Sequence, residues 1–191
     1  KLISLLEKLE YTCLQGSTDQ EVKNVIYDSR KVEEGSLFIC IRGAVVDGHK
    51  FVPDVVAKGA KVLIVEEAVE APEDVTVILV KDTRYAMAFI SAAYFGYPAE
   101  KLKTIGITGT KGKTTTTYMI KEILEKAGHK VGLIGTIATY INGKMISESA
   151  RTTPESIELQ KTFAQMVEAG VEYVVMEVSS QSLKLHRVDG C

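Results

Sequence analysis

The stretch Thr104 to Thr117 reads Thr-Ile-Gly-Ile-Thr-Gly-Thr-Lys-Gly-Lys-Thr-Thr-Thr-Thr. The apolar segment 101–107 predicts a short buried strand, and 116–127 has apolar residues at the spacing of a helix with one buried face. A strand, a glycine-bearing turn and a helix in this order form a phosphate-binding loop, because glycines let the backbone approach an anion and N–H groups point at it. We therefore expect a nucleotide site here, with Lys113 reaching the terminal phosphates and the Thr114 hydroxyl binding a magnesium ion.

The glycine spacing of this loop departs from the common pattern Gly-x-x-x-x-Gly-Lys-[Ser/Thr]. The glycines lie at Gly106, Gly109 and Gly112, so the shorter pattern Gly109-Thr-Lys-Gly-Lys-Thr114 is present instead. A Gly-Lys-Thr tripeptide alone is common in surface turns. The expected strand before it and the expected helix after it make nucleotide binding the better interpretation.

Composition limits the class of protein. The chain has 191 residues, 46% hydrophobic and 25% charged, and a net charge of −2. This balance is ordinary for a globular protein and gives no electrostatic case for nucleic acid or an anionic membrane. No apolar run approaches the roughly 20 residues of a membrane span, and the three scattered cysteines fit a reducing compartment. We expect a cytoplasmic protein without membrane insertion.

Residues that end helices and form turns predict two domains in the chain. Gly96-Tyr97-Pro98 ends an expected helix, so we place a boundary there and expect a small mixed α/β domain over 1–98. In 99–191, strands alternate with helices, which predicts a doubly wound parallel sheet. Three local expectations accompany this fold: an opening helix over 2–9, a hairpin turn at Asn142-Gly143, and a helix capped by Thr153 with Pro154 in its first turn.

Glu177 is the second residue that points to chemistry. It ends the near-continuous apolar segment 171–178, and ligands of open α/β sheets bind at the carboxyl ends of strands. A carboxylate there could hold the magnesium ion that nucleotide chemistry needs, or it could simply meet solvent. His186 and Arg187 could bind an anionic substrate or form an exposed basic pair, and Asp28-Ser29-Arg30 is turn-forming by composition.

Taken together, these motifs resemble the Mur ligases, whose ATP loop has the short glycine spacing. The resemblance extends over essentially the whole chain and is closest to the branch that makes UDP-N-acetylmuramoyl-tripeptide. It is carried by the following segments: Thr108 to Thr115, Asp28-Ser29-Arg30, Gly35 to Phe38, Gly43 with Asp47-Gly48, Thr152 to Ser156, and Met176 to Ser180 followed by His186-Arg187-Val188. Folylpolyglutamate synthetases share the ATP loop but not the amino-terminal domain.

The resemblance implies an ATP-dependent amide ligase of peptidoglycan synthesis. Its substrates would be ATP with Mg2+, UDP-N-acetylmuramoyl-L-alanyl-D-glutamate, and a third amino acid, either meso-diaminopimelate or L-lysine. Transfer of the γ-phosphate to the D-glutamate carboxylate would give an acyl phosphate, which the incoming amine displaces. The work of the protein would be positioning and charge neutralisation.

The same resemblance implies roles for individual residues, with Lys113 and Glu177 as the catalytic pair. The expected ATP site comprises Gly109, Thr110, Lys111, Gly112, Lys113, Thr114 and Thr115, and the expected magnesium ligands are Thr114 and Glu177. Uridine would bind at Ser29, Ala44, Val45 and Val46, and the muramoyl dipeptide at Thr152, Thr153, Ser179 and Arg187. Two departures, Arg151 for asparagine and Leu185 for a polar residue, remove contacts that other members have.

Several alternatives stay open. The sibling ligase that adds the terminal dipeptide shares the first-domain motifs but lacks Thr-Thr-Pro and Glu-Val-Ser-Ser. A regulatory P-loop protein, or a non-catalytic nucleotide-binding module, would bind ATP without a UDP-sugar. The chain starts at Lys1 and ends at Cys191, so we expect an amino-terminal fragment that does not complete the reaction alone. The sequence leaves the oligomeric state open, with a monomer expected.

Overall fold

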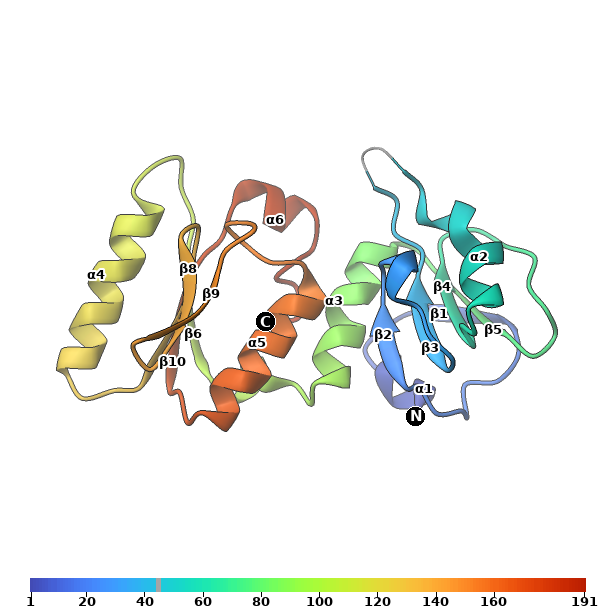
Figure 1. Cartoon of the computed structure of the whole chain (residues 1–191), viewed down its shortest axis with the longest axis horizontal. Helices are drawn as coiled ribbons and strands as arrows, with labels where there is room; N and C mark the ends of the chain where they lie inside the picture. Colours follow the sequence, from blue (N-terminus) through green and yellow to red (C-terminus); the bar gives the residue numbers. More distant parts are fainter. Residues whose placement is uncertain (44–45) are drawn as a thin grey trace. The chain divides into compact units, whose positions relative to one another are not determined.

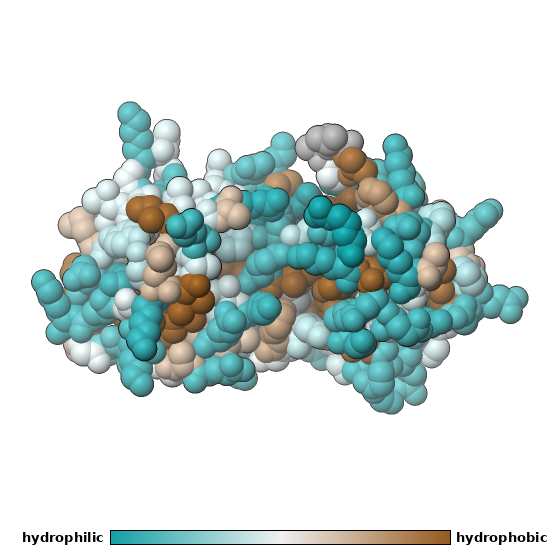
Figure 2. Space-filling model, viewed as in Figure 1, coloured by the Kyte–Doolittle hydropathy of each residue, from teal (hydrophilic) through white to brown (hydrophobic). Residues whose placement is uncertain are grey.

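The computed structural model describes residues 1–43 and 46–191, which form two compact units, Lys1–Tyr94 and Phe95–Cys191 (Figure 1). Each unit contains one five-stranded sheet with helices on both faces. Hydrophilic residues cover most of the face drawn in Figure 2, where apolar residues show in small groups. In the described part of the chain, no helix has the length and apolar character that a membrane span requires.

The sheet of the first unit has the strand order β1-β5-β4-β3-β2, with only β1 antiparallel to its neighbour. Its elements are α1 (Leu2–Leu5), β1 (Tyr11–Gln15), β2 (Asn24–Ile26), the 3-10 turn η1 (Ser29–Lys31), β3 (Ser36–Ile39), the 3-10 turn η2 (Gly48–Phe51), α2 (Val52–Ala57), β4 (Val62–Val65), β5 (Thr76–Val80) and α3 (Thr83–Tyr94).

The core of the first unit lies on both faces of its central strands. All four residues of β4 are fully buried, as expected for a parallel strand that is covered on both sides. Helix α2 packs on one face through Val52 and Val55, and α3 covers the other face (Figure 1). Asp82 caps α3, since its carboxylate accepts hydrogen bonds from the N–H groups of Arg84 and Tyr85 in the first turn.

The start of the chain differs from its prediction. The expected helix over 2–9 is only the four-residue α1, and the strand β1 that follows was not anticipated. Strand β1 is an edge strand whose side chains are mostly exposed. An edge strand of this kind needs no alternation of apolar residues, so the pattern that identifies buried strands is absent.

The sheet of the second unit has the order β6-β10-β7-β8-β9. Strands β6, β10 and β7 are parallel, whereas β8 and β9 form an antiparallel hairpin at one edge, so the expected parallel sheet is a mixed one. Its elements are the 3-10 turn η3 (Pro98–Lys101), β6 (Lys103–Ile107), α4 (Lys113–Lys126), β7 (Val131–Ile134), β8 (Ala138–Ile141), β9 (Lys144–Glu148), α5 (Ser156–Glu168), β10 (Tyr173–Glu177) and α6 (Ser180–Lys184).

Successive side chains of β10 face opposite helices. Val174 and Met176 pack with Phe163 of α5, while Val175 packs on the other face with the apolar residues of α4. The hairpin turn is confirmed: Asn142 and Gly143 have φ of 49° and 78°, the left-handed values that its two-residue turn requires. The parallel strands β6, β10 and β7 all end at the same edge of the sheet, which is where the candidate site lies.

Candidate functional site: a phosphate loop beside a buried carboxylate

The phosphate loop joins β6 to α4, so the predicted order of strand, turn and helix is confirmed. Gly112 precedes the helix with φ of 80°, a left-handed conformation that a glycine adopts without strain. Helix α4 begins at Lys113, three residues before the predicted start, so Thr114 and Thr115 lie in its first turn. The ammonium group of Lys113 donates a hydrogen bond to the carbonyl oxygen of Gly109 at 2.7 Å, across the loop.

Glu177 points its carboxylate at the start of α4. Parallel pairing of β10 with β6 places Glu177 beside Ile107, the last residue before the loop. One carboxylate oxygen, Oε1, accepts hydrogen bonds from the Thr114 hydroxyl at 3.0 Å and from the Thr136 N–H at 2.9 Å. The other oxygen accepts from the Thr136 hydroxyl at 3.1 Å. The phosphate loop and the ends of β10 and β7 are therefore joined through one acidic group.

The surroundings of Glu177 suit a cation. Its residue is 1% exposed, and no lysine, arginine or histidine of the described chain forms an ion pair with it. A buried carboxylate is normally paired with a positive charge or bound to a metal. The hydroxyl of Thr114 and the carboxylate of Glu177 are the hard oxygen ligands that magnesium prefers, so the residues present fit a magnesium ion.

A pocket of about 330 Å3 opens beside this group. It is lined by Thr110, Lys111, Gly112, Lys113, Thr114, Thr115, Thr136, Thr152 and Glu177. Most of the expected ATP residues therefore share one cavity with Glu177 and with Thr152, the first of the residues expected to bind the muramoyl dipeptide. On α4 nearby, burial raises the pKa of Tyr118 to about 12, and the Tyr140 hydroxyl and the charge of Glu177 act in the same direction.

The other residues expected at the muramoyl dipeptide site have internal partners. Thr153 is completely buried, and its hydroxyl donates to the Glu177 carbonyl oxygen at 2.9 Å and accepts from the Ser179 N–H at 3.1 Å. The prediction that Thr153 caps the following helix is wrong, since α5 begins at Ser156 and Glu155 precedes it. The Thr153 hydroxyl is already engaged at the end of β10, so it cannot cap α5.

Arg187 is also buried, contrary to the alternative of an exposed basic pair with His186. Its guanidinium donates to the Glu155 carboxylate at 2.8 Å and to the Thr153 carbonyl oxygen at 3.1 Å. Ser179 precedes the short helix α6 and its hydroxyl accepts from the Ser182 N–H, as a capping serine does. Of the four residues, Thr152 is the one that lines the pocket.

Sequence reasoning missed two residues of this region, Thr136 and Glu155. Thr136 follows β7 at its carboxyl end, so the rule that singled out Glu177 would also have identified Thr136. Its hydroxyl lies 3.1 Å from the Thr152 hydroxyl as well as from Glu177. No local pattern indicates Glu155, because its partner Arg187 is 32 residues away along the chain.

Of the expected uridine residues, Ser29 lies beyond the carboxyl end of β2 in the first unit. Ser29 begins the turn η1, and its carbonyl oxygen accepts a hydrogen bond from the Lys58 ammonium group at 3.0 Å. The neighbouring Asp28 accepts two hydrogen bonds from the Arg30 guanidinium, which lowers the pKa of Asp28 to about 2. Ala44 and Val45 lie outside the described residues, and Val46 is 46% exposed.

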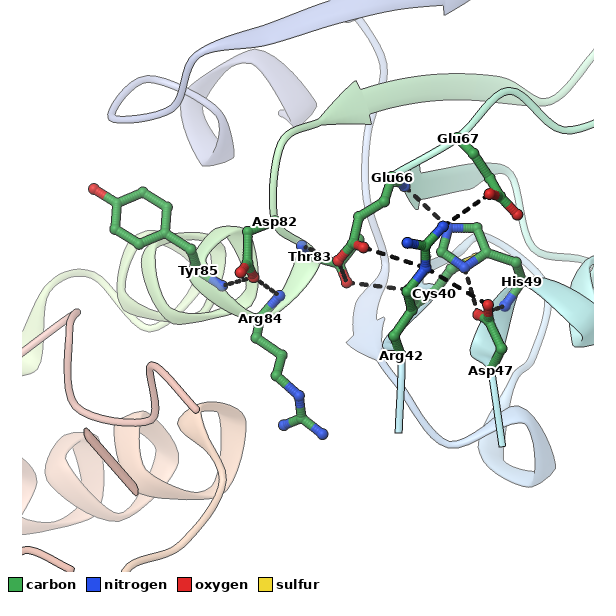
Figure 3. A network of polar contacts seen from close by, with 10 residues as sticks. All are labelled: Cys40, Arg42, Asp47, His49, Glu66, Glu67, Asp82, Thr83, Arg84 and Tyr85. Atoms are coloured by element: carbon green, nitrogen blue, oxygen red, sulfur yellow. Dashed lines mark hydrogen bonds and ion pairs between the residues drawn. The ribbon is translucent and has the colours of Figure 1, made fainter. Parts of the chain in front are cut away.

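A network of charged residues flanks the segment that contains Val46. Figure 3 shows Arg42 between Asp47 on one side and Glu66 and Glu67 on the other, with Nε 3.6 Å from Asp47 and a terminal nitrogen 2.8 Å from Glu67. Glu66 accepts in turn from the N–H and the hydroxyl of Thr83 at the start of α3. These contacts tie both ends of the loop to β4 and α3.

Asp47, His49 and Glu67 are close enough together to suggest a metal site, but the histidine has no free nitrogen. His49 Nε2 accepts a hydrogen bond from the Glu66 N–H at 3.0 Å, so its proton must be on Nδ1, which lies 2.6 Å from Asp47. The His49 N–H is the main cause that lowers the pKa of Asp47. This cluster is therefore a structural hydrogen-bond network.

Comparison with known proteins identifies the family of the chain. The family model described as "Mur ligase family, catalytic domain" matches residues 21–95, and the one described as "Mur ligase middle domain" matches residues 107–191. The chain is 57% identical over 189 residues to the UDP-N-acetylmuramoyl-L-alanyl-D-glutamate–2,6-diaminopimelate ligase of Clostridium perfringens, and 53% identical over 189 residues to the ligase of the same name from Clostridium botulinum.

These matches cover 99% and 97% of the chain but 39% of either relative, so the chain spans about two fifths of the length of these proteins. A solved structure of a ligase with the same name has a TM-score of 0.75 at 24% identity, and the match covers 93% of this chain and 36% of that one. At this identity the likeness concerns the fold alone. From the two family models and the high identity of these relatives, the chain belongs to the Mur ligase family.

Proposed function

We propose that this chain carries the nucleotide sites of an ATP-dependent ligase that adds diaminopimelate to UDP-N-acetylmuramoyl-L-alanyl-D-glutamate in the cytoplasm. The relatives that match it at 57% and 53% identity bear the name of this reaction. We assign UDP binding to residues 1–98 and ATP binding to residues 99–191. Because the relatives are much longer, we expect the remaining substrate site and the complete reaction to need residues that this chain lacks.

The observation that carries this proposal is the contact between Glu177 and Thr114. It joins a buried carboxylate, which forms no ion pair within the described residues, to the first turn of the helix after the phosphate loop. Gly109 to Thr115 would bind the phosphates of ATP through backbone N–H groups and the helix start. Thr114 and Glu177 would hold the magnesium ion, which supplies positive charge against the phosphate oxygens when it is bound.

Lys113 would provide the mobile charge of the site. Its ammonium group now lies on the Gly109 carbonyl oxygen, and rotation of the side chain would bring it to the terminal phosphates. Thr152 borders the same pocket, so the muramoyl dipeptide would meet ATP there. Thr153, Ser179 and Arg187 support that side of the pocket through their internal hydrogen bonds.

Isothermal titration with UDP-N-acetylmuramoyl-L-alanyl-D-glutamate tests the proposal, with UDP alone as the reference ligand. We expect saturable binding of both ligands and a loss of affinity of about tenfold in Ser29→Ala, because a hydrogen bond to a charged ligand contributes about 1.5–3 kcal/mol. Ser4→Ala, an exposed serine in α1 of the same unit, is the matched control.

The result also separates the alternatives. A folded chain that binds ADP but neither UDP ligand would contradict the ligase proposal and favour a P-loop protein of another function. Binding of UDP ligands that is equal in Ser29→Ala and Ser4→Ala would show that the uridine site is misplaced.

A further inference from the structure

A buried ion pair lies next to the pocket, and the proposed function gives no role to its acidic member. The side chains of Glu155 and Arg187 are only 7% and 8% exposed, and the carboxylate and guanidinium are 2.8 Å apart. Removing one partner of such a pair leaves a buried charge without compensation, which is far less favourable than the intact pair. The Nε atom of Arg187 has no hydrogen-bond partner in the described chain, so Glu155 is its main support.

Arg187 in turn holds the backbone of Thr153, beside the pocket. Its other terminal nitrogen donates to the Thr153 carbonyl oxygen at 3.1 Å. The Thr153 hydroxyl in turn binds the Glu177 carbonyl oxygen and the Ser179 N–H. The segment before α5 is thereby held to the end of β10 from two sides, by the guanidinium and by the threonine hydroxyl.

The residue that this arrangement presents to the pocket is Thr152. It directly precedes Thr153, and its hydroxyl lies 3.1 Å from the Thr136 hydroxyl, which donates to the Glu177 carboxylate. Thr152 and Thr153 are neighbours in the chain. A shift of the Thr153 backbone would therefore move Thr152 away from Thr136. The position of Thr152 therefore depends on a side chain that does not line the pocket itself.

Arg151 contacts the same carboxylate from the solvent side. It forms an ion pair with the Glu155 oxygen that also binds Arg187, but its side chain is 53% exposed. An exposed ion pair contributes little because water screens it. The buried contact with Arg187 therefore holds the carboxylate more firmly than the contact with Arg151 does.

We infer that Glu155 is a positioning residue for the muramoyl dipeptide site: it holds Arg187 in place, and Arg187 fixes Thr153 and so the position of Thr152. The inference rests on the proposed function, because it assigns Glu155 to the substrate of that reaction. It predicts a defect that is specific for the dipeptide-bearing ligand, since the contact between Glu155 and Arg187 acts on the segment before α5, which carries Thr152.

The test is titration of Glu155→Gln with three ligands: UDP-N-acetylmuramoyl-L-alanyl-D-glutamate, UDP and ADP. Glutamine keeps the size of the side chain and one oxygen acceptor but removes the charge that compensates Arg187. We expect the affinity for the muramoyl dipeptide ligand to fall about tenfold, as for loss of one charged hydrogen bond. Affinities for UDP and ADP should stay within about twofold, the range of independent sites.

Glu158→Gln is the matched control, because it removes one negative charge from an exposed position in the first turn of α5, three residues from Glu155. Arg187→Gln and the double variant Glu155→Gln/Arg187→Gln test whether Glu155 acts through Arg187. If Glu155 acts through Arg187, the double variant binds the muramoyl dipeptide ligand as weakly as Arg187→Gln alone. Thermal unfolding checks that each variant is folded. If Glu155→Gln is not folded, Glu155→Asp replaces it, because aspartate keeps the charge but shortens the side chain.

Two results would overturn the inference. One is unchanged affinity of Glu155→Gln for the muramoyl dipeptide ligand, and the other is an equal loss for all three ligands, which a general structural defect would cause. Failure of the proposed function looks different: the unaltered chain itself would bind UDP and the muramoyl dipeptide ligand with the same affinity, or neither of them.

Discussion

Substitution of Gly135 by alanine tests how the position of Glu177 is set. Gly135 lies between β7 and Thr136, and a Cβ atom built there would be 2.6 Å from Oε1 of Glu177. Its backbone φ is not in the left-handed region, so alanine is strained only by this contact. An ordinary contact begins near 3.4 Å, so the carboxylate oxygen has to retreat by about 0.8 Å.

The retreat affects both hydrogen bonds to Oε1, from the Thr114 hydroxyl at 3.0 Å and from the Thr136 N–H at 2.9 Å. Hydrogen bonds to charged groups contribute about 1.5–3 kcal/mol each. Alanine also restricts the unfolded chain, which stabilises the protein by about 0.4–1 kcal/mol. With both bonds weakened rather than lost, we expect Gly135→Ala to lower the free energy of unfolding by about 2 kcal/mol.

The more specific expectation concerns magnesium. A displaced carboxylate no longer shares its position with the Thr114 hydroxyl, so the increase in ADP affinity that magnesium causes should fall by about tenfold or more. Urea unfolding measures the first effect, and titration of ADP with and without magnesium measures the second.

Gly132→Ala provides the control, because its added Cβ would be 2.6 Å from the sulfur atom of Met166 in the core. Overpacking there costs about 1–3 kcal/mol but leaves Glu177 untouched. If Gly135→Ala lost stability and kept the full magnesium effect, as expected for Gly132→Ala, our account of the Glu177 position would be refuted.

Two further expectations concern single charged residues. Lys113→Ala should weaken ATP binding by roughly a hundredfold, because a charged contact to phosphate is lost, while the free energy of unfolding stays the same. Titration with ATP and urea unfolding measure the two quantities. An ATP affinity within a few-fold of that of the unaltered chain would contradict the expectation. The Arg30 guanidinium holds the pKa of Asp28 at about 2, below its ordinary value of 3.8, so this pair stabilises the folded state above pH 4 and the contribution is lost as the pH falls from 4 to 2. In acid unfolding, Asp28→Asn should therefore show a slightly flatter dependence than the unaltered chain over that window, and an identical curve would argue against the pair.

Local sequence patterns correctly predicted the strand–turn–helix order around the phosphate loop and the place of Glu177 at the end of a strand. The phosphate loop depends on glycines, a lysine and a threonine within a few residues, so its strand–turn–helix context can be derived from neighbouring residues alone. Glu177 was identifiable because it is the polar end of an apolar strand. The Asn142-Gly143 turn was identifiable because its two residues tolerate positive φ.

The missed features depend on contacts between segments that are distant in the sequence. Thr153 has the local pattern of a helix cap, yet it binds the end of β10 instead, because the pairing of β10 with β6 and β7 brings a carbonyl oxygen and an N–H group within its reach. The sequence pattern around Arg187 allows an exposed basic residue, whereas the structure shows it buried in an ion pair with Glu155.

The sequence by itself therefore determined the strand, turn and helix of the phosphate loop and the position of the candidate magnesium carboxylate, because each depends on residues that are neighbours along the chain. Only the tertiary structure decided which side chains face the pocket. Thr136 binds the Glu177 carboxylate and contacts Thr152 from a separate segment, while Thr153 and Arg187 turn inward. The physical reason is that hydrogen bonds within a buried edge of a sheet are chosen by strand register and packing, which local propensity does not encode.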